Sequence, residues 1–152
     1  MADEKKSLDI DEQNNIAEAV LRIVTGYPDF PSTITEKEVR LDSVDKPEEV
    51  GVIPTAGAVI VQQYISGSFE AQFPFVICYK CNPTTNQAVI EKRKVLENLC
   101  KWMRGMEYPA LSDGRKILQI EQTTNVVKIS EDKSGASIFQ CGCRLKYFKK
   151  RS

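Results

Sequence analysis

The sequence feature that most constrains the fold is the alternation of apolar and polar residues between Gly57 and Cys81. After Ser66-Gly67-Ser68, seven residues share one side of the chain: Phe69, Ala71, Phe73, Phe75, Ile77, Tyr79 and Cys81. A side-chain period of two over this length predicts a strand with one buried face. The Ser-Gly-Ser break predicts a hairpin connection, because glycine accepts the positive φ that tight turns need. We therefore expect this hairpin to be the centre of a sheet.

Apolar residues recur at helical spacing in residues 11–25 and 86–105, so each segment predicts an amphipathic helix. Gly26 marks the end of the first helix, and either a threonine before Asn86 or Asn86 itself is expected to cap the second. The apolar stripe of the second helix ends in three large residues, Trp102, Met103 and Met106. Their spacing indicates core packing more than a binding site.

The remaining segments predict further strands. Residues 136–149 alternate over their whole length, residues 117–123 and 125–130 are either two short strands or one kinked strand, and residues 38–42 form a short strand. The acidic stretch 45–49 predicts a surface loop. Pro74 has no amide hydrogen for a sheet ladder, so it predicts an edge position or a bulge.

This order of elements predicts an α+β fold, with a mainly antiparallel sheet and two helices packed on one of its faces. At 152 residues the chain is expected to form a single domain, 1–152, in which residues 1–8 are a disordered lead-in and residues 9–150 fold. No apolar run approaches the length that crosses a bilayer, and the charged N-terminus is unlike a secretion signal. We therefore expect a soluble protein, made in a reducing cytosol, with no membrane partner.

Composition argues against an enzyme. The chain has no histidine, which excludes Ser-His and Cys-His nucleophile pairs and imidazole zinc ligands. No other nucleophile–base pair or cofactor motif is recognisable, so we expect no catalytic residues and no cofactor. Lys plus Arg total 21 and Asp plus Glu total 21, so the chain lacks the overall basic charge that is typical of proteins that grip nucleic acid.

Four of the five cysteines form the pattern that most resembles a metal site: Cys78, Cys81, Cys141 and Cys143. Four thiolates could hold zinc tetrahedrally, and this zinc-stabilised interaction module is the alternative hypothesis for the chain. The spacing favours packing instead, because residues three apart in a strand face opposite sides and the last two cysteines belong to an apolar row. A redox role for the first pair is disfavoured, because such motifs usually open a helix.

Basic residues gather at the C-terminal end of the chain: Arg144, Lys146, Lys149, Lys150 and Arg151. With Tyr147 and Phe148 among them, they could stack on and contact a nucleic acid. A solvated strand end, or a patch for an acidic partner, is the more common meaning of such a run. Residues 45–49 in a neighbouring copy of the chain are one candidate for that partner.

From Ile65 to its end, the chain resembles a known family. The shared features are ISGSFEAQFPFVICYK, a helix that carries Trp102, the segment YPALSDGRK, and a last strand ending in CGCRLKYF. In this order they resemble the small minor capsid, or tail-terminator, proteins of long-tailed phages and of prophages in Gram-positive bacteria.

The resemblance implies an assembly role without catalysis. Family members of this type are α+β subunits that form a ring, commonly a hexamer, at the head-proximal end of the tail tube. There the ring ends tube polymerisation and offers a surface for head joining. The implied partners are other copies of the chain, the major tail tube protein, a head-completion protein, and DNA that passes through the lumen without sequence recognition.

The implied location is the virion, at the head–tail junction, after synthesis in the bacterial cytoplasm. Candidate subunit or lumen contacts are the exposed hairpin turn and polar residues on the less apolar faces of the two long strands. These are Ser66, Gly67, Ser68, Glu70, Gln72, Lys80, Arg144 and Lys146.

Overall fold

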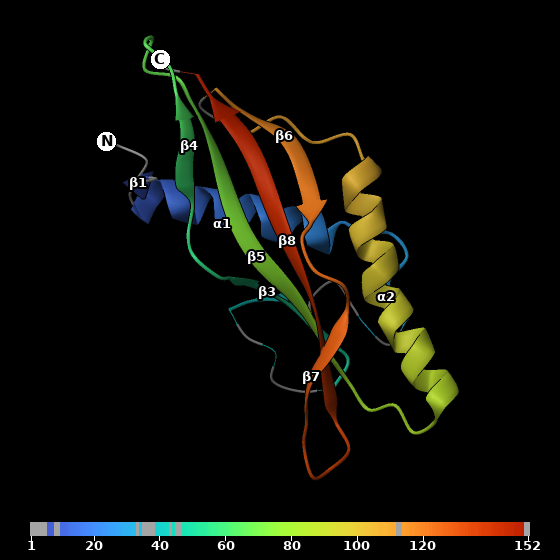
Figure 1. The fold of residues 1–152 in the computed structure, drawn as a ribbon. Helices are drawn as coiled ribbons and strands as arrows, with labels where there is room; N and C mark the ends of the chain where they lie inside the picture. The colour runs from blue at the N-terminus through green and yellow to red at the C-terminus, as the bar shows by residue number, and fades with distance from the viewer. Residues whose placement is uncertain are drawn as a thin grey trace.

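A computed structural model describes residues 6–7, 10–32, 34, 39–42, 44, 47–111 and 114–150. Within these residues the chain forms an eight-stranded, mostly antiparallel sheet with two helices on one face, which confirms the predicted α+β fold (Figure 1). Neither of these helices is long and apolar enough to cross a membrane.

Two long strands, β5 (Phe69–Cys81) and β8 (Ser137–Lys149), form the centre of the sheet. They pair in antiparallel register without interruption, from Phe69 opposite Lys149 to Cys81 opposite Ser137. The predicted alternation is confirmed, since Ala71, Phe73, Phe75, Ile77, Tyr79 and Cys81 are buried on one face of β5. The centre is therefore the β5–β8 pair, whereas the predicted hairpin contributes only one of its arms.

The other arm of the hairpin is β4 (Val59–Gln63), which pairs with the first part of β5. Gly67 in the connecting turn has a φ of 93°, as the sequence predicts. At its outer edge β4 pairs with β1 (Lys6–Ser7), which corrects the predicted disorder for these two residues. The rest of the lead-in before the first helix, residues 1–5 and 8–9, lies outside the described residues.

Helix α1 (Ile10–Thr25) begins one residue before its predicted start, and α2 (Asn86–Gly105) has its predicted bounds. Thr85 caps α2, because its side-chain oxygen accepts a hydrogen bond from the Ala88 amide at 3.0 Å. The two helices bury their apolar stripes against the same side of the sheet, on which the aromatic side chains of β5 and β8 form the core. The predicted packing role of Met103 is confirmed by its complete burial.

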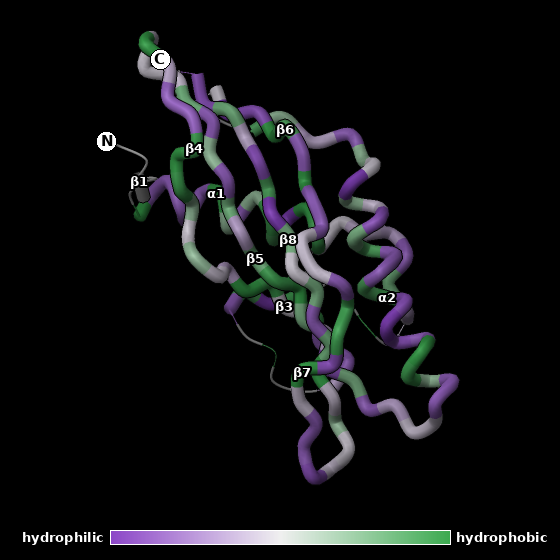
Figure 2. Tube along the Cα trace, viewed as in Figure 1, coloured by the Kyte–Doolittle hydropathy of each residue, from purple (hydrophilic) through white to green (hydrophobic). Residues whose placement is uncertain are grey.

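Strand β3 (Glu49–Pro54) was missed by the sequence analysis. It pairs with the second half of β5, and β2 (Val39–Leu41) runs parallel to it at the edge of the sheet. Glu49 is buried, so the predicted surface loop over 45–49 is wrong at this residue; residues 45 and 46 lie outside the described part of the chain. Figure 2 shows hydrophobic residues where β3 lies beside β5.

Pro74 lies within the central strand β5, not at an edge of the sheet, and the pairing of β5 with β8 continues through it without a bulge. Its carbonyl oxygen accepts a hydrogen bond from the amide of Thr55, in the link between β3 and β4. Because the two backbone polar groups of a strand residue point to the same side, the missing amide of Pro74 faces this link as well. Pro74 is tolerated because it lies beside the link where β3 ends and β4 begins, so no neighbouring strand needs its amide hydrogen.

Strands β6 (Arg115–Gln122) and β7 (Val127–Glu131) pair separately with the two halves of β8, so the two-strand alternative is confirmed. Their link crosses β8 at Gly142, whose amide donates to the Thr124 hydroxyl at 2.7 Å and whose carbonyl accepts from the Thr123 amide. A Cβ added to Gly142 would lie 2.7 Å from Thr124 Oγ1, so this close approach requires glycine.

Candidate functional site

The sheet face opposite the helices brings together three of the predicted contact residues. Gln72 on β5 lies opposite Lys146 on β8, and Arg144 lies two residues further along β8. The residue that joins them is Glu121 on β6, which the sequence did not predict as part of a site. Its carboxylate accepts from Arg144 Nη2 at 2.5 Å and lies 3.2 Å from Lys146 Nζ. The predicted basic strip is thus partly neutralised from within the same subunit.

Hydrogen bonds from Arg144 and then Lys146 lower the pKa of Glu121, so its carboxylate stays ionised. The three side chains are between 33% and 41% exposed, so the cluster is a polar surface open to solvent. Ionic groups that are already paired add little affinity for a nucleic acid, because each would exchange one partner for another. This face fits a polar contact between proteins better than a strong grip on DNA.

The tip of the β4–β5 hairpin projects beyond the sheet (Figure 1). Ile65 at this tip is fully exposed, with a relative accessibility of 106%. Ser66 is exposed and Gly67 half-buried, but Ser68 is buried, so the predicted contact set is wrong in placing Ser68 on the accessible surface. The tip is held in shape by the amide of Tyr64, which donates to the Ser68 carbonyl at 2.9 Å.

The other two predicted contacts lie apart from the polar cluster. Glu70 accepts a hydrogen bond from the Tyr64 hydroxyl at 2.8 Å, so it belongs to the hairpin tip. Lys80 lies opposite Ile138, near the other end of β5. The eight predicted residues therefore form two separate groups, at the tip and on the sheet face, with Lys80 outside both.

The aromatic residues of the C-terminal strand do not form a stacking surface. Tyr147 is completely buried, and its hydroxyl donates to Glu12 at 2.9 Å. Lys149 Nζ lies 3.5 Å from the same carboxylate. Phe148 is half-buried beside Tyr64, and Arg151 lies outside the described residues. The prediction that Tyr147 could stack on nucleic-acid bases is therefore wrong.

Glu12 belongs to a buried ionic network that joins α1 to β6 and β8. Arg115 donates from Nε at 2.8 Å and from Nη2 at 2.5 Å to the two oxygens of Glu12, and both side chains are less than one-tenth exposed. Burial by itself would raise the pKa of Glu12. The hydrogen bonds from Arg115 and Tyr147, with the charge of Lys149, outweigh that effect and lower the pKa below its usual value.

The acidic residues at the start of β3 are engaged within the subunit. Glu48 lies 2.9 Å from Lys92 Nζ and accepts from the Tyr79 hydroxyl at 2.5 Å. Glu49 lies 3.6 Å from Arg40. Burial, and then the bond to Glu48, raises the pKa of Tyr79, so that its hydroxyl remains a donor. These pairings leave the stretch less suited to the predicted role as an electrostatic partner for a neighbour's basic strand.

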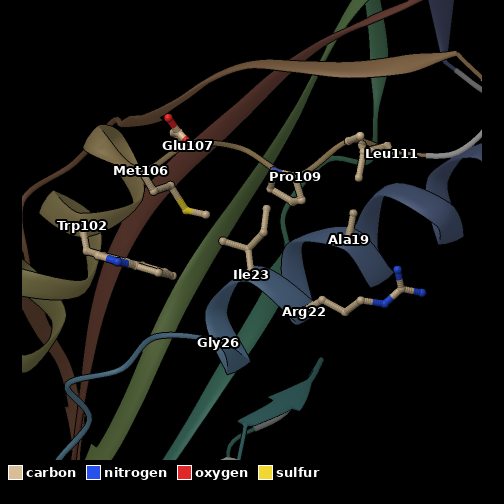
Figure 3. A pocket seen from close by; sticks show the side chains of 10 residues that line it. Ala19, Arg22, Ile23, Gly26, Trp102, Met106, Glu107, Pro109 and Leu111 are labelled. Carbon is tan, nitrogen blue, oxygen red and sulfur yellow. The ribbon is translucent and has the colours of Figure 1, made fainter.

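An apolar pocket opens on the helix side of the molecule, where the C-terminal ends of α1 and α2 meet the segment that follows α2 (Figure 3). Its volume is about 410 Å³. Ile23 from α1, Trp102 from α2 and Met106 just after α2 point into it, and Pro109 and Leu111 close the far side (Figure 3). Arg22 and Glu107 are the charged residues that line the pocket. Such a pocket could accept an apolar side chain.

Trp102 is only half-buried, although the sequence predicts it to be core. One side of its ring contacts Tyr27, at 5.2 Å between ring centroids, and another part lines the pocket. Sequence reasoning could not distinguish these roles, because a residue at the margin of a helical stripe has the same spacing as a core residue.

The four cysteines of the zinc alternative are not brought together. Cys78 lies on the opposite sheet face, where its thiol contacts Gln140 Oε1 at 3.6 Å, and Cys81 lies at the end of β5, opposite Ser137. Burial raises the pKa of both thiols to about 11, which fits inert core thiols better than redox centres. Cys141 and Cys143 instead approach Cys100 of α2, a grouping that the sequence analysis missed.

Comparison with known proteins adds no relative: neither protein-family descriptions nor the curated proteins match the chain.

Proposed function

We propose that the chain is a structural virion protein of the tail-terminator type, a subunit that assembles into a ring at the head-proximal end of a phage tail tube. The proposal is supported by the order of motifs from Ile65 to the C-terminus, which carries the family resemblance. The α+β fold agrees with what that resemblance implies, since two helices cover one face of the sheet and leave the other face without helices. The ring would end tube polymerisation and offer a surface for head joining.

The observation that carries this proposal furthest is a pair of different surfaces on the same subunit. A ring needs a head-to-tail interface, in which one patch of a subunit meets a different patch of the next. The hairpin tip offers the fully exposed Ile65, and the pocket beside Trp102 offers an apolar recess. In Figure 1 the tip lies at the upper left and α2 at the right, so the two surfaces are different patches of the subunit, as a head-to-tail contact requires.

Charge supports the same pairing of surfaces. Glu70 lies beside the tip, while Arg22 lies at the pocket with its side chain three-quarters exposed. Arg22 already lies 3.7 Å from Glu18, and Glu107 also lines the pocket, so charges at the rim of this contact would favour correct orientation more than affinity. We therefore propose that the occupant of the pocket is the hairpin tip of a second copy.

The experiment is assembly in solution and on tubes. Purified chain is examined by light scattering over a range of concentrations, and it is mixed with purified phage tail tubes for negative-stain imaging. The proposal expects closed rings and capped tubes of limited length. A chain that stays monomeric at high concentration and leaves tube length unchanged defeats it.

A further inference from the structure

Three thiols converge in the core between α2 and the sheet. Cys141 and Cys143 are two residues apart on β8 and face the same side, and Cys100 of α2 lies across from them. Its sulfur is 2.9 Å from Cys141 Sγ and 3.8 Å from Cys143 Sγ, and all three sulfurs lie within 4.8 Å of one another. Each of the three residues is at most 2% exposed.

Filling the core does not require this convergence. A buried thiol behaves as a small apolar group, and small apolar side chains pack without their ends meeting at one point. Sulfur atoms that do meet at one point are what a thiophilic metal ion binds. Cys78 and Cys81, by contrast, are buried singly elsewhere in the sheet, so the chain contains both kinds of cysteine.

We propose that Cys100, Cys141 and Cys143 form a three-sulfur binding site for a soft monovalent cation, Cu(I). The number of sulfur ligands indicates which cation the site would bind. Thiolates select Cu(I), zinc or iron–sulfur clusters. Structural zinc sites take four protein ligands, and iron–sulfur clusters are usually held by four. In the described part of the chain this group contains three residues, and their burial keeps water from serving as a fourth ligand.

The spacing of the sulfurs is close to what a trigonal site needs. A cation bonded to three sulfurs at about 2.3 Å in one plane holds them about 4.0 Å apart. The 3.8 Å separation of Cys100 and Cys143 already fits, whereas the 2.9 Å separation of Cys100 and Cys141 must open by about 1 Å on binding. A small rotation of the Cys141 side chain would supply this movement without changing the separation of Cys100 and Cys143.

Charge balance points to a partner on the same helix. Cu(I) bound by thiolates leaves a net negative charge in the core, and binding releases the thiol protons to solvent. Arg104 lies one turn beyond Cys100 on α2, and its positive charge acts on both Cys100 and Cys141. Because Arg104 is exposed to solvent, its guanidinium offsets only a small part of the cost of burying the charged site.

Competition with a coloured Cu(I) chelator tests the site. Reduced protein is titrated without oxygen against the Cu(I)–bicinchoninate complex, and loss of the complex's colour measures transfer. We expect one copper per chain for the native protein and for Cys78→Ser, a control that removes a buried thiol outside the group. Cys100→Ser and Cys143→Ser should bind at least tenfold more weakly. No transfer to the native protein, or unchanged transfer to these two variants, overturns the proposal.

Two further measurements keep the test decisive if a variant does not fold. X-ray absorption of the copper-loaded native protein should show three sulfur neighbours around copper, and a shell of oxygen or nitrogen neighbours overturns the assignment. Added Zn²⁺ should be displaced by Cu(I), and zinc that is retained in four-coordinate form overturns the choice of cation. None of these measurements depends on ring formation. A negative result for copper binding therefore leaves the proposed function untouched, and a failure of ring assembly leaves the copper site untouched.

Discussion

Replacing Arg115 by methionine should destabilise the fold strongly, because it leaves the Glu12 carboxylate buried without its main partner. The pair is bidentate, and the two side chains are 5% and 8% exposed. Breaking such a pair from one side costs about 3–5 kcal/mol, since the remaining charge stays buried. For a chain of this length that loss lowers the melting temperature by roughly 6–20 °C.

A double substitution separates the effect of the charge from the effect of packing. Glu12→Gln combined with Arg115→Met removes both charges but keeps an acceptor for the Tyr147 hydroxyl. We expect this variant to be more stable than Arg115→Met alone, because a buried pair replaced on both sides loses little. Lys128→Met, which breaks an exposed pair at 2.9 Å, is the control and should cost less than about 1 kcal/mol.

Urea unfolding at pH 7, followed by circular dichroism, measures each free energy of unfolding. The reasoning is refuted if Arg115→Met costs under about 1 kcal/mol, or if the double variant is the less stable of the two.

Three other changes test separate parts of the account. Because the pKa of Glu12 is lowered in the folded protein, its carboxylate stabilises the fold above its usual pKa, and this stabilisation is lost as pH falls through the lowered value. Glu12→Gln should therefore flatten the acid side of a curve of unfolding free energy against pH. An unchanged acid side contradicts this. Gly142→Ala should cost about 1–3 kcal/mol in urea unfolding, because the new methyl group would meet Thr124 Oγ1 at 2.7 Å, and a neutral result would show that the β6–β7 link gives way. Ile65→Asp should weaken each subunit contact by about 1.5–3 kcal/mol, or roughly 10- to 150-fold, without changing monomer stability, because it removes the apolar group that we propose enters the pocket beside Trp102 of a second copy. Unchanged assembly by light scattering would exclude the tip as a contact.

The elements that could be predicted are those whose apolar residues keep one period. Strands β5 and β8 alternate along most of their length, apart from three consecutive buried residues at 77–79 and at 141–143, and α1 and α2 carry clear apolar stripes and end signals. Strand β3 was missed for the opposite reason: four consecutive residues from Glu49 to Val52 are buried, so no alternation distinguishes it. A glutamate is expected at the surface, and only the contact of Glu49 with Arg40 explains why it is buried here.

The candidate sites depend on contacts between distant parts of the chain, and local patterns do not determine these. Glu121 neutralises Arg144 only because β6 and β8 pair in one particular register. Cys100 lies on a predicted helical stripe and Cys143 in a predicted strand row, but their approach follows from how α2 packs on the sheet. Pro74 likewise needed the positions of β3 and β4 before its place in a central strand made physical sense.

The measurement that tests the proposed function most directly is the mass of the purified chain in solution, followed by imaging of the same sample with tail tubes. A ring subunit should approach a fixed multiple of the 17.1 kDa chain as concentration rises, with six as the multiple that the family resemblance implies, and should cap the tubes. A mass that stays at 17.1 kDa at every concentration, together with tubes of unchanged length, would contradict the proposal.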